Sequence, residues 1–304
     1  MNRMPRRAVA ALTALVAATL LTACSDADGQ PTSAAPVATA SDGHAHSHDD
    51  DGSSGSALPG EHVHGVAIDA ADGRVYLATH EGLFLRDGST WTRVGPVIDL
   101  MGFTAAGPGH FYASGHPGAG VDLPNPVGLI ESTDAGETWQ PLSRQGVSDF
   151  HAMTASQEGV VAFDGSRLES TSDGTTWRPL SVPVPPFAMD VSPDGATLVV
   201  TSESGPVRST DGGAQWEKLA DAPLLQVVAW ADDDTVVGVT PDGVVAVSED
   251  RGARWEQKAE LEAPPSALAA VRESDGSLRV VAITQGGALE SRDLAAGFAP
   301  LGDG

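Results

Sequence analysis

The sequence predicts an all-β fold in which one small structural unit is repeated around a ring. A short segment that begins with Asp, turns and ends in Trp recurs about every 40 residues from residue 60 onward. Between these segments, apolar runs of strand length alternate with turns rich in Gly and Asp. A fixed period of this size indicates units that bury their faces only against neighbours on both sides.

The repeated Asp-to-Trp segment is expected to be a structural turn. An Asp carboxylate can accept backbone N–H groups that a turn leaves unpaired, and the aromatic side chain that follows is expected to pack between units. A degenerate sixth copy runs from Asp293 to Phe298. The clear copies begin and end at Asp87 and Trp91, Asp134 and Trp139, Asp173 and Trp177, Asp211 and Trp216, and Asp250 and Trp255.

Each repeat contains four predicted strands. In the first repeat, the apolar runs cover residues 64–68, 74–78, 83–85 and 91–94, and later repeats keep the same order. Four short antiparallel strands with such turns form one blade of a β-propeller. Six blades fit the length at about 40 residues each. A seventh blade is the alternative count, and no overlapping strand that would fasten the ring is identified.

Two copies of the turn carry a family resemblance. The pattern Ser-Thr-Asp-x-Gly-x-x-Trp runs from Ser132 to Trp139 and from Ser209 to Trp216. It resembles the Asp-box (BNR) repeat of sialidase-like, glycosyl hydrolase-like β-propellers among bacterial exported proteins. The resemblance covers nearly everything after residue 60. It implies a pocket around the central channel, on the face opposite the Asp-box turns.

The N-terminal segment predicts export and membrane attachment. A basic start is followed by an apolar run at residues 8–21, which is short for a membrane span, and the run ends at Cys24. This ending resembles the bacterial lipobox, so residues 1–23 are a predicted lipoprotein signal peptide and Cys24 the lipidated residue; a plain cleaved signal is the alternative. Cys24 is the only cysteine, which rules out an internal disulfide.

Residues 24–58 are a predicted disordered tether, and residues 59–304 the propeller. The tether has almost no large apolar side chains with which to offset the entropy cost of ordering it. Its His44, His46 and His48 resemble a weak metal-scavenging tract, although a simple solvated or pH-responsive spacer explains them equally well. The chain has 17 basic and 41 acidic residues and a net charge of −24, which argues against nucleic-acid binding and favours cations.

The histidines predict a site on one rim of the propeller. All nine precede residue 152, and the blade scheme aims five of them, from three adjacent blades, at one sector of the pocket face. Imidazoles with nearby carboxylate and thioether groups suit copper or zinc; a hydrogen-bonded polar channel mouth is the alternative. His110 falls on the opposite face and is expected to be structural. The candidate ligands are His62, His64, His80, His116, Asp149, His151, Asp99 and Met101.

An insertion follows His116 in the second blade and lengthens that repeat. It occupies residues 117–126 and emerges on the histidine face. It is expected either to cover the pocket or to be an ordinary tolerated surface insertion.

Sialidase chemistry finds little support in the sequence. That family holds its substrate with three arginines and uses a Tyr–Glu pair as nucleophile, but only Arg144 and Arg167 are placed near this rim. Tyr76 and Tyr112 occupy matching mid-strand positions that indicate core packing. A different glycosidase using Asp99, Asp122 or Asp149 stays open, and no catalytic residue is assigned.

The sequence therefore favours a binding module over an enzyme. We expect a propeller held by the lipid on Cys24 at the extracytoplasmic face of the cell membrane. Its expected partner is a small ligand, a metal ion or an exported protein. A glycoside hydrolase and a scaffold for the assembly of another exported protein are the alternatives.

Overall fold

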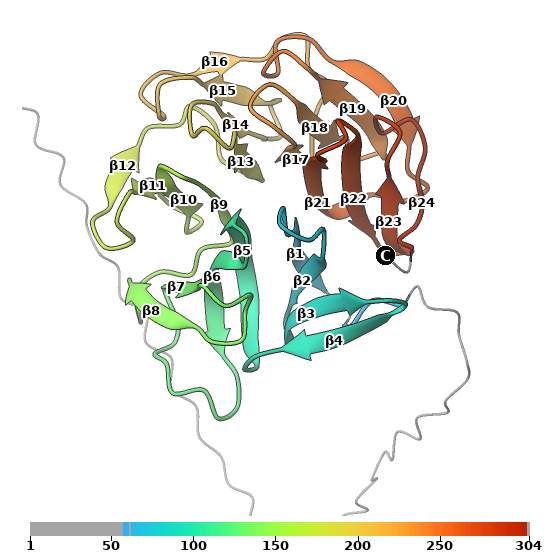
Figure 1. Cartoon of the computed structure of the whole chain (residues 1–304). Coiled ribbons are helices and arrows are strands. Elements are labelled where there is room, and N and C mark those ends of the chain that lie inside the picture. Colours follow the sequence, from blue (N-terminus) through green and yellow to red (C-terminus); the bar gives the residue numbers. More distant parts are fainter. Residues whose placement is uncertain (1–56, 61, 303–304) are drawn as a thin grey trace, which may run out of the picture. The chain divides into compact units, whose positions relative to one another are not determined.

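The computed structural model describes residues 57–60 and 62–302, which form six four-stranded antiparallel sheets arranged as a β-propeller (Figure 1). The predicted signal peptide, Cys24 and the tether histidines 44, 46 and 48 lie outside the described residues. In neither described range is there a helix long and apolar enough to cross a membrane. The predicted all-β class and the count of six blades are confirmed.

Each blade consists of four strands that follow one another along the chain. Blades 1 to 3 contain β1 (Val63–Ile68), β2 (Val75–Thr79), β3 (Gly82–Asp87), β4 (Thr90–Val94); β5 (Ile98–Gly107), β6 (His110–Pro117), β7 (Leu129–Ser132), β8 (Gln140–Ser143); β9 (Ala152–Ser156), β10 (Gly159–Phe163), β11 (Leu168–Thr171) and β12 (Arg178–Leu180). Blades 4 to 6 contain β13 (Met189–Val191), β14 (Leu198–Val200), β15 (Val207–Ser209), β16 (Glu217–Lys218); β17 (Val227–Trp230), β18 (Val236–Val239), β19 (Val244–Ser248), β20 (Glu256–Glu260); β21 (Pro265–Arg272), β22 (Leu278–Thr284), β23 (Gly287–Ser291) and β24 (Ala299–Pro300).

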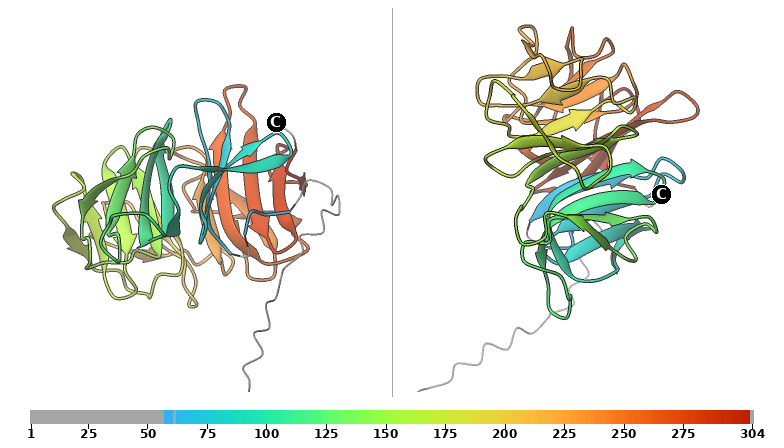
Figure 2. Two further views of the ribbon diagram at one scale, coloured as in Figure 1. Left: turned by 90° about the horizontal axis from the view of Figure 1, so that it is seen from below. Right: turned by 90° about the vertical axis from the view of Figure 1, so that its left-hand side faces the viewer.

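The first strand of every blade faces the hub. Each of β1, β5, β9, β13, β17 and β21 contacts the first strand of the next blade, and β21 contacts β1 (Figure 1). Seen from the side, the strands run between the two faces of the propeller (Figure 2). Because every sheet is built from consecutive strands, the ring of described residues closes by packing of blade 6 on blade 1 and not by a shared strand. Across this junction, Arg279 Nη1 donates to the Gly73 carbonyl at 2.5 Å.

Six apolar clusters fill the spaces between neighbouring blades. Each cluster contains one aromatic residue from the Asp-to-aromatic turns, which is the packing expected from the sequence. All six clusters lie within residues 58–301, and the described residues belong to one compact unit. The propeller therefore carries its own core and can be tested without the preceding segment. The six aromatic residues are Trp91, Trp139, Trp177, Trp216, Trp255 and Phe298.

The Asp of each typical turn is tied to the backbone. In blade 2, Asp134 Oδ1 accepts from the Thr138 amide at 2.9 Å and from Ser132 Oγ at 2.8 Å. Hydrogen bonds, the Thr138 hydroxyl first, hold the pKa of the Asp134 carboxyl below its usual value. The first copy differs from this pattern. Asp87 pairs directly with Thr90 across β3 and β4, so that turn is a tight hairpin.

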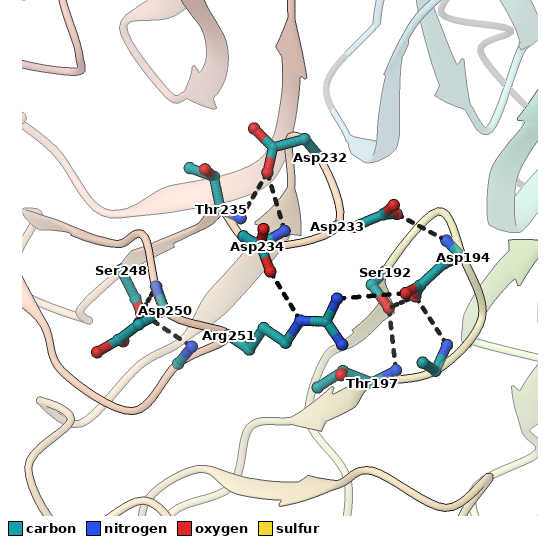
Figure 3. Close-up of polar contacts among 12 residues, drawn as sticks. Ser192, Asp194, Thr197, Asp232, Asp233, Asp234, Thr235, Ser248, Asp250 and Arg251 are labelled. Carbon is teal, nitrogen blue, oxygen red and sulfur yellow. Dashed lines mark hydrogen bonds and ion pairs between the residues drawn. The ribbon is translucent and has the colours of Figure 1, made fainter.

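On the turn face of blades 4 and 5, acidic residues are partnered by an arginine. Arg251 Nε donates to Asp234 Oδ1 at 2.8 Å, and Arg251 Nη2 lies 3.5 Å from Asp194 Oδ2 (Figure 3). Asp233 Oδ1 accepts from the Asp194 amide at 2.9 Å. These carboxylates therefore join two blades, which is a structural role.

Candidate metal centre at the histidine rim

Two blades bring together the first part of the predicted rim. His64 lies in β1, His80 lies in the turn from β2 to β3, and Asp99 lies near the start of β5. The turn that carries His80 has a fixed frame: the Thr79 hydroxyl donates to the Gly82 carbonyl at 3.0 Å and accepts from the Glu81 amide at 3.1 Å. Strand pairing and this frame aim the imidazole of His80 at its two neighbours.

The ligand atoms of His64, His80 and Asp99 lie within 4.8 Å of one another. His64 Nε2 and His80 Nε2 are 3.3 Å apart, and His80 Nδ1 lies 2.8 Å from Asp99 Oδ1. A zinc ion 2.0–2.1 Å from both Nε2 atoms would see them at an angle of about 107°, close to the tetrahedral value. The separation of the two imidazoles therefore fits one shared metal ion.

The hydrogen bond to Asp99 sets the tautomer of His80. An ionised carboxylate only accepts, so His80 Nδ1 carries the proton and Nε2 keeps its lone pair toward His64. Metal-ligating histidines commonly donate their second N–H to a carboxylate in this way. Burial, and then the neighbouring His80, lowers the pKa of His64, which favours the neutral imidazole that a metal requires.

Two further predicted ligands border this group. The ring of His62 packs edge-on against His80, with centroids 5.3 Å apart, but His62 is not among the three converging ligands. Met101 lines the central channel together with His64 and His151. The channel has a volume of about 380 Å³, so His64 borders a space that admits small ligands.

The remaining predicted rim residues form a second group around Asp149. His151 Nε2 lies 2.8 Å from Asp149 Oδ2, and His116 Nε2 lies 3.3 Å from the same oxygen. His116 faces Asp99 across β5 and β6, which places this group beside the first. The structure thus gathers the five predicted histidines on one rim, around two different carboxylates.

Close backbone approaches hold this rim, and glycine makes them possible. A Cβ on Gly115 would lie 1.9 Å from the Asp99 carbonyl oxygen, and the φ of Gly115 is 145°. A Cβ on Gly102 would lie 2.2 Å from the Phe150 carbonyl oxygen. The first approach sets Asp99 beside His116, and the second brings blade 2 against the start of blade 3.

The insertion of blade 2 supports the rim instead of covering the channel. Its Val121 and Leu123 pack against the core between blades 1 and 2, and Asn125 Oδ1 lies 2.7 Å from His116 Nδ1. Among the described residues that line the channel, none comes from residues 117–126. The expected cover over the pocket is therefore not seen. Asn125 is a rim residue that the sequence reasoning missed, and its only signal was its place in an insertion directly after His116.

The residues considered for sialidase chemistry are engaged elsewhere. Tyr76 is fully buried in the core. Burial and then Glu131 raise the pKa of Tyr112 to about 12, which opposes its ionisation as a nucleophile. Arg144 pairs with Glu169 at 3.0 Å and stacks on Trp177, so it is not free to clamp a substrate carboxylate.

His110 has the structural role expected of it on the opposite face. Its Nε2 lies 2.7 Å from Glu131 Oε1, and its ring packs on Tyr112. This histidine is therefore a matched control for experiments on the rim.

Comparisons with known proteins establish the fold class. Neither the protein-family models nor the curated protein sequences give a match to this chain. Among solved structures, a chain of a nidogen/laminin complex superimposes with a TM-score of 0.56 and 14% identity, over 73% of this chain and 89% of that one. An ancestral GH74 enzyme gives a TM-score of 0.52 and 14% identity over 76% of this chain but only 36% of its own. YCF48 bound to a D1 peptide gives 0.45 and 15%, over 68% and 70%. At these identities the likeness shows a β-propeller and nothing finer.

Proposed function

We propose that the protein is an exported, membrane-tethered β-propeller that binds one copper or zinc ion through Nε2 of His64 and Nε2 of His80, while Asp99 holds His80 through Nδ1. The observation that supports this most strongly is the 3.3 Å separation of the two Nε2 atoms. Asp99 orients His80 by accepting from its Nδ1. A direct N–H···N hydrogen bond is the competing explanation, and 3.3 Å is long for one. The acidic net charge of −24 concentrates cations near the surface.

Metal analysis of the propeller tests this proposal. Residues 51–304, which omit the tether histidines, are stripped of metal, exposed to Zn²⁺ or Cu²⁺, desalted and assayed for metal per chain. We expect His64→Ala and His80→Ala each to lose one equivalent of metal. His110→Gln is the control, because it keeps a donor for Glu131 on the opposite face.

Two outcomes would contradict the proposal. One is a parent protein that binds no metal. The other is a His64→Ala variant that binds as much metal, as tightly, as the parent. Thermal unfolding with chelator present checks that the variants are folded.

Membrane attachment rests on the N-terminal sequence. The apolar run before Cys24 and the lipobox-like ending support lipidation. We expect wild-type protein in the membrane fraction and the Cys24→Ala protein in the soluble exported fraction. Equal membrane retention of both would contradict a lipid anchor on Cys24.

The glycoside hydrolase alternative has weaker support from the site. The rim carboxylates Asp99 and Asp149 are both held by imidazoles. Turnover of a fluorogenic glycoside by the metal-free propeller, abolished in Asp149→Asn, would favour the hydrolase over the metal-binding module.

A further inference from the structure

We propose that the rim holds a second metal site, formed by His116, Asp149 and His151 beside the first. This inference goes beyond the single site argued above and depends on a different set of side chains. It assigns the same chemical class of ligand, a divalent transition-metal ion such as zinc, cobalt or copper.

The lone pairs of Asn125, His116 and Asp149 show where a positive charge is needed. Asn125 Oδ1 is only an acceptor, so the 2.7 Å contact assigns the proton of His116 to Nδ1. In the neutral imidazole, Nε2 then directs a lone pair at Asp149 Oδ2, 3.3 Å away. Two electron-rich atoms face each other stably only when a cation or a second proton lies between them. The arrangement of Asn125, His116 and Asp149 therefore calls for a positive charge at this position.

One oxygen of the Asp149 carboxylate lacks a hydrogen-bond partner in the part of the chain that the structure describes. This atom, Oδ1, is buried. Buried polar atoms in native proteins are normally satisfied, and an exception often marks a missing ion or water. Because Oδ1 receives no hydrogen bond from the described residues, groups around Oδ2 must balance the carboxylate charge. Both imidazoles approach Oδ2.

The three ligand atoms do not all lie within 4.8 Å of one another, so His151 must turn toward His116 before all three can reach one ion. At metal–ligand distances near 2.1 Å, a separation of 3.3 Å between His116 Nε2 and Asp149 Oδ2 corresponds to about 105° at the metal. The 2.8 Å contact of His151 is shorter than a tetrahedral edge by roughly half an ångström. The His151 side chain is 54% exposed, so it can turn to open that distance.

The supporting contacts also resemble those of metal sites. A ligating histidine usually donates its second N–H to a carbonyl or carboxylate, and Asn125 supplies that acceptor for His116 as Asp99 does for His80. In the first site the carboxylate of Asp99 supports His80, whereas in the second site the carboxylate of Asp149 is itself a ligand. Asn125 is a positioning residue for the second site, since it touches His116 and not the metal.

Cobalt binding distinguishes the two sites. The metal-free propeller, residues 51–304, is titrated with Co²⁺ while visible absorption is recorded, and bound metal is then counted with Zn²⁺ after desalting. We expect two equivalents per chain in the parent. We expect one in His116→Ala, one in His64→Ala and none in the double variant. Asn125→Ala should weaken only the second equivalent, by about 10–100-fold, and His110→Gln should keep both.

The outcomes separate this inference from the proposed function. One equivalent in the parent that is lost in His64→Ala but retained in His116→Ala would overturn the second site and leave the first standing. One equivalent that follows the opposite pattern would overturn the first site and keep the second. If no variant changes the count, and ¹⁵N NMR shows His116 doubly protonated at neutral pH with Zn²⁺ present, a proton and not a metal supplies the charge, and the second site is wrong.

Discussion

The same turn occurs in blade 1 and blade 4, but it presents different side chains. In blade 1 the Thr79 hydroxyl donates to the Gly82 carbonyl, and in blade 4 the Ser202 hydroxyl donates to the Gly205 carbonyl at 2.7 Å. Both turns end at a glycine with positive φ, 118° in blade 1 and 101° in blade 4. Between these anchors, blade 1 carries His80 where blade 4 carries Glu203.

The comparison separates what the repeat requires from what the site requires. The hydroxyl and the glycine recur because they satisfy the backbone of the turn. His80 instead contacts His64 and Asp99, outside its own turn. When a turn recurs within the chain, a side chain that points its polar atoms away from the turn is thus a better candidate for binding than one that closes the turn.

The largest loss of stability is expected at a rim glycine where a side chain has no room. Gly115→Ala places a Cβ 1.9 Å from the Asp99 carbonyl at a φ of 145°, and strain plus overpacking should cost about 3–5 kcal/mol. Urea unfolding measures this. Gly107→Ala, at the other end of β5 with open space around it, is the control and should be near neutral. Equal stability of the two variants would show that the rim is not held as described.

Replacing His80, the side chain that the blade 1 turn presents, tests the site directly. His80→Gln should weaken metal binding by more than the roughly 10–100-fold that loss of a supporting partner costs, with unchanged unfolding in chelator. The matched variant Glu203→His, which places an imidazole on the same frame in blade 4, should acquire no metal. Calorimetric titration with Zn²⁺ measures both. Metal binding by Glu203→His would show that an imidazole on this turn binds metal without His64 and Asp99.

Blades 4 to 6 contain no histidine, but the hub carries a buried carboxylate there, that of Asp190. Asp190 accepts from the Thr154 hydroxyl at 2.6 Å and the Trp230 amide at 2.7 Å, which joins blades 3, 4 and 5. Burial raises its pKa to about 6, from 3.8. The folded state therefore binds the extra proton, so this stabilisation is complete below about pH 4 and is lost as the pH rises through 6.

This linkage predicts a pH-dependent difference between variants. The stability of wild type relative to Asp190→Asn should fall by on the order of 1–3 kcal/mol between pH 4 and pH 7. Denaturant unfolding of both proteins across that range measures the change. A difference that is flat with pH, or that grows toward pH 7, would contradict the raised pKa.

The smallest loss of stability is expected when the turn hydroxyls of Thr79 and Ser202 are removed. Thr79→Val and Ser202→Ala should each cost about 1 kcal/mol, because each removes a hydroxyl that satisfies turn backbone. Only Thr79→Val should also weaken metal binding, since only its turn carries a rim ligand. Unfolding and Zn²⁺ titration of both variants check this contrast. An equal loss of metal affinity in Ser202→Ala would mean that the effect is global.

Periodicity explains why much of the fold was predictable. Once the Asp-to-Trp turns define a period, the alternation of strand direction places residues such as His64 and His151 on one face. The same reasoning placed His110 on the other face, beside Glu131. These inferences need only the order of strands and not their distances.

Contacts between blades were not predictable in the same way. The division of the rim histidines between Asp99 and Asp149 depends on distances that no spacing encodes. Asn125 lies in an insertion outside the repeat, so the period says nothing of its position. Asp87 begins an Asp-to-Trp segment like the other turns but has Leu85 where they have Ser or Thr two residues before the Asp, and its pairing with Thr90 makes a tighter hairpin. Closure of the ring likewise follows from side-chain packing, which the strand pattern does not contain.

Anomalous diffraction from crystals of the zinc-loaded propeller tests the central claim most directly. We expect a zinc peak about 2.0–2.1 Å from both His64 Nε2 and His80 Nε2, with Asp99 in contact with His80. A loaded crystal with no peak between these imidazoles, or with zinc only at other surface residues, would contradict it.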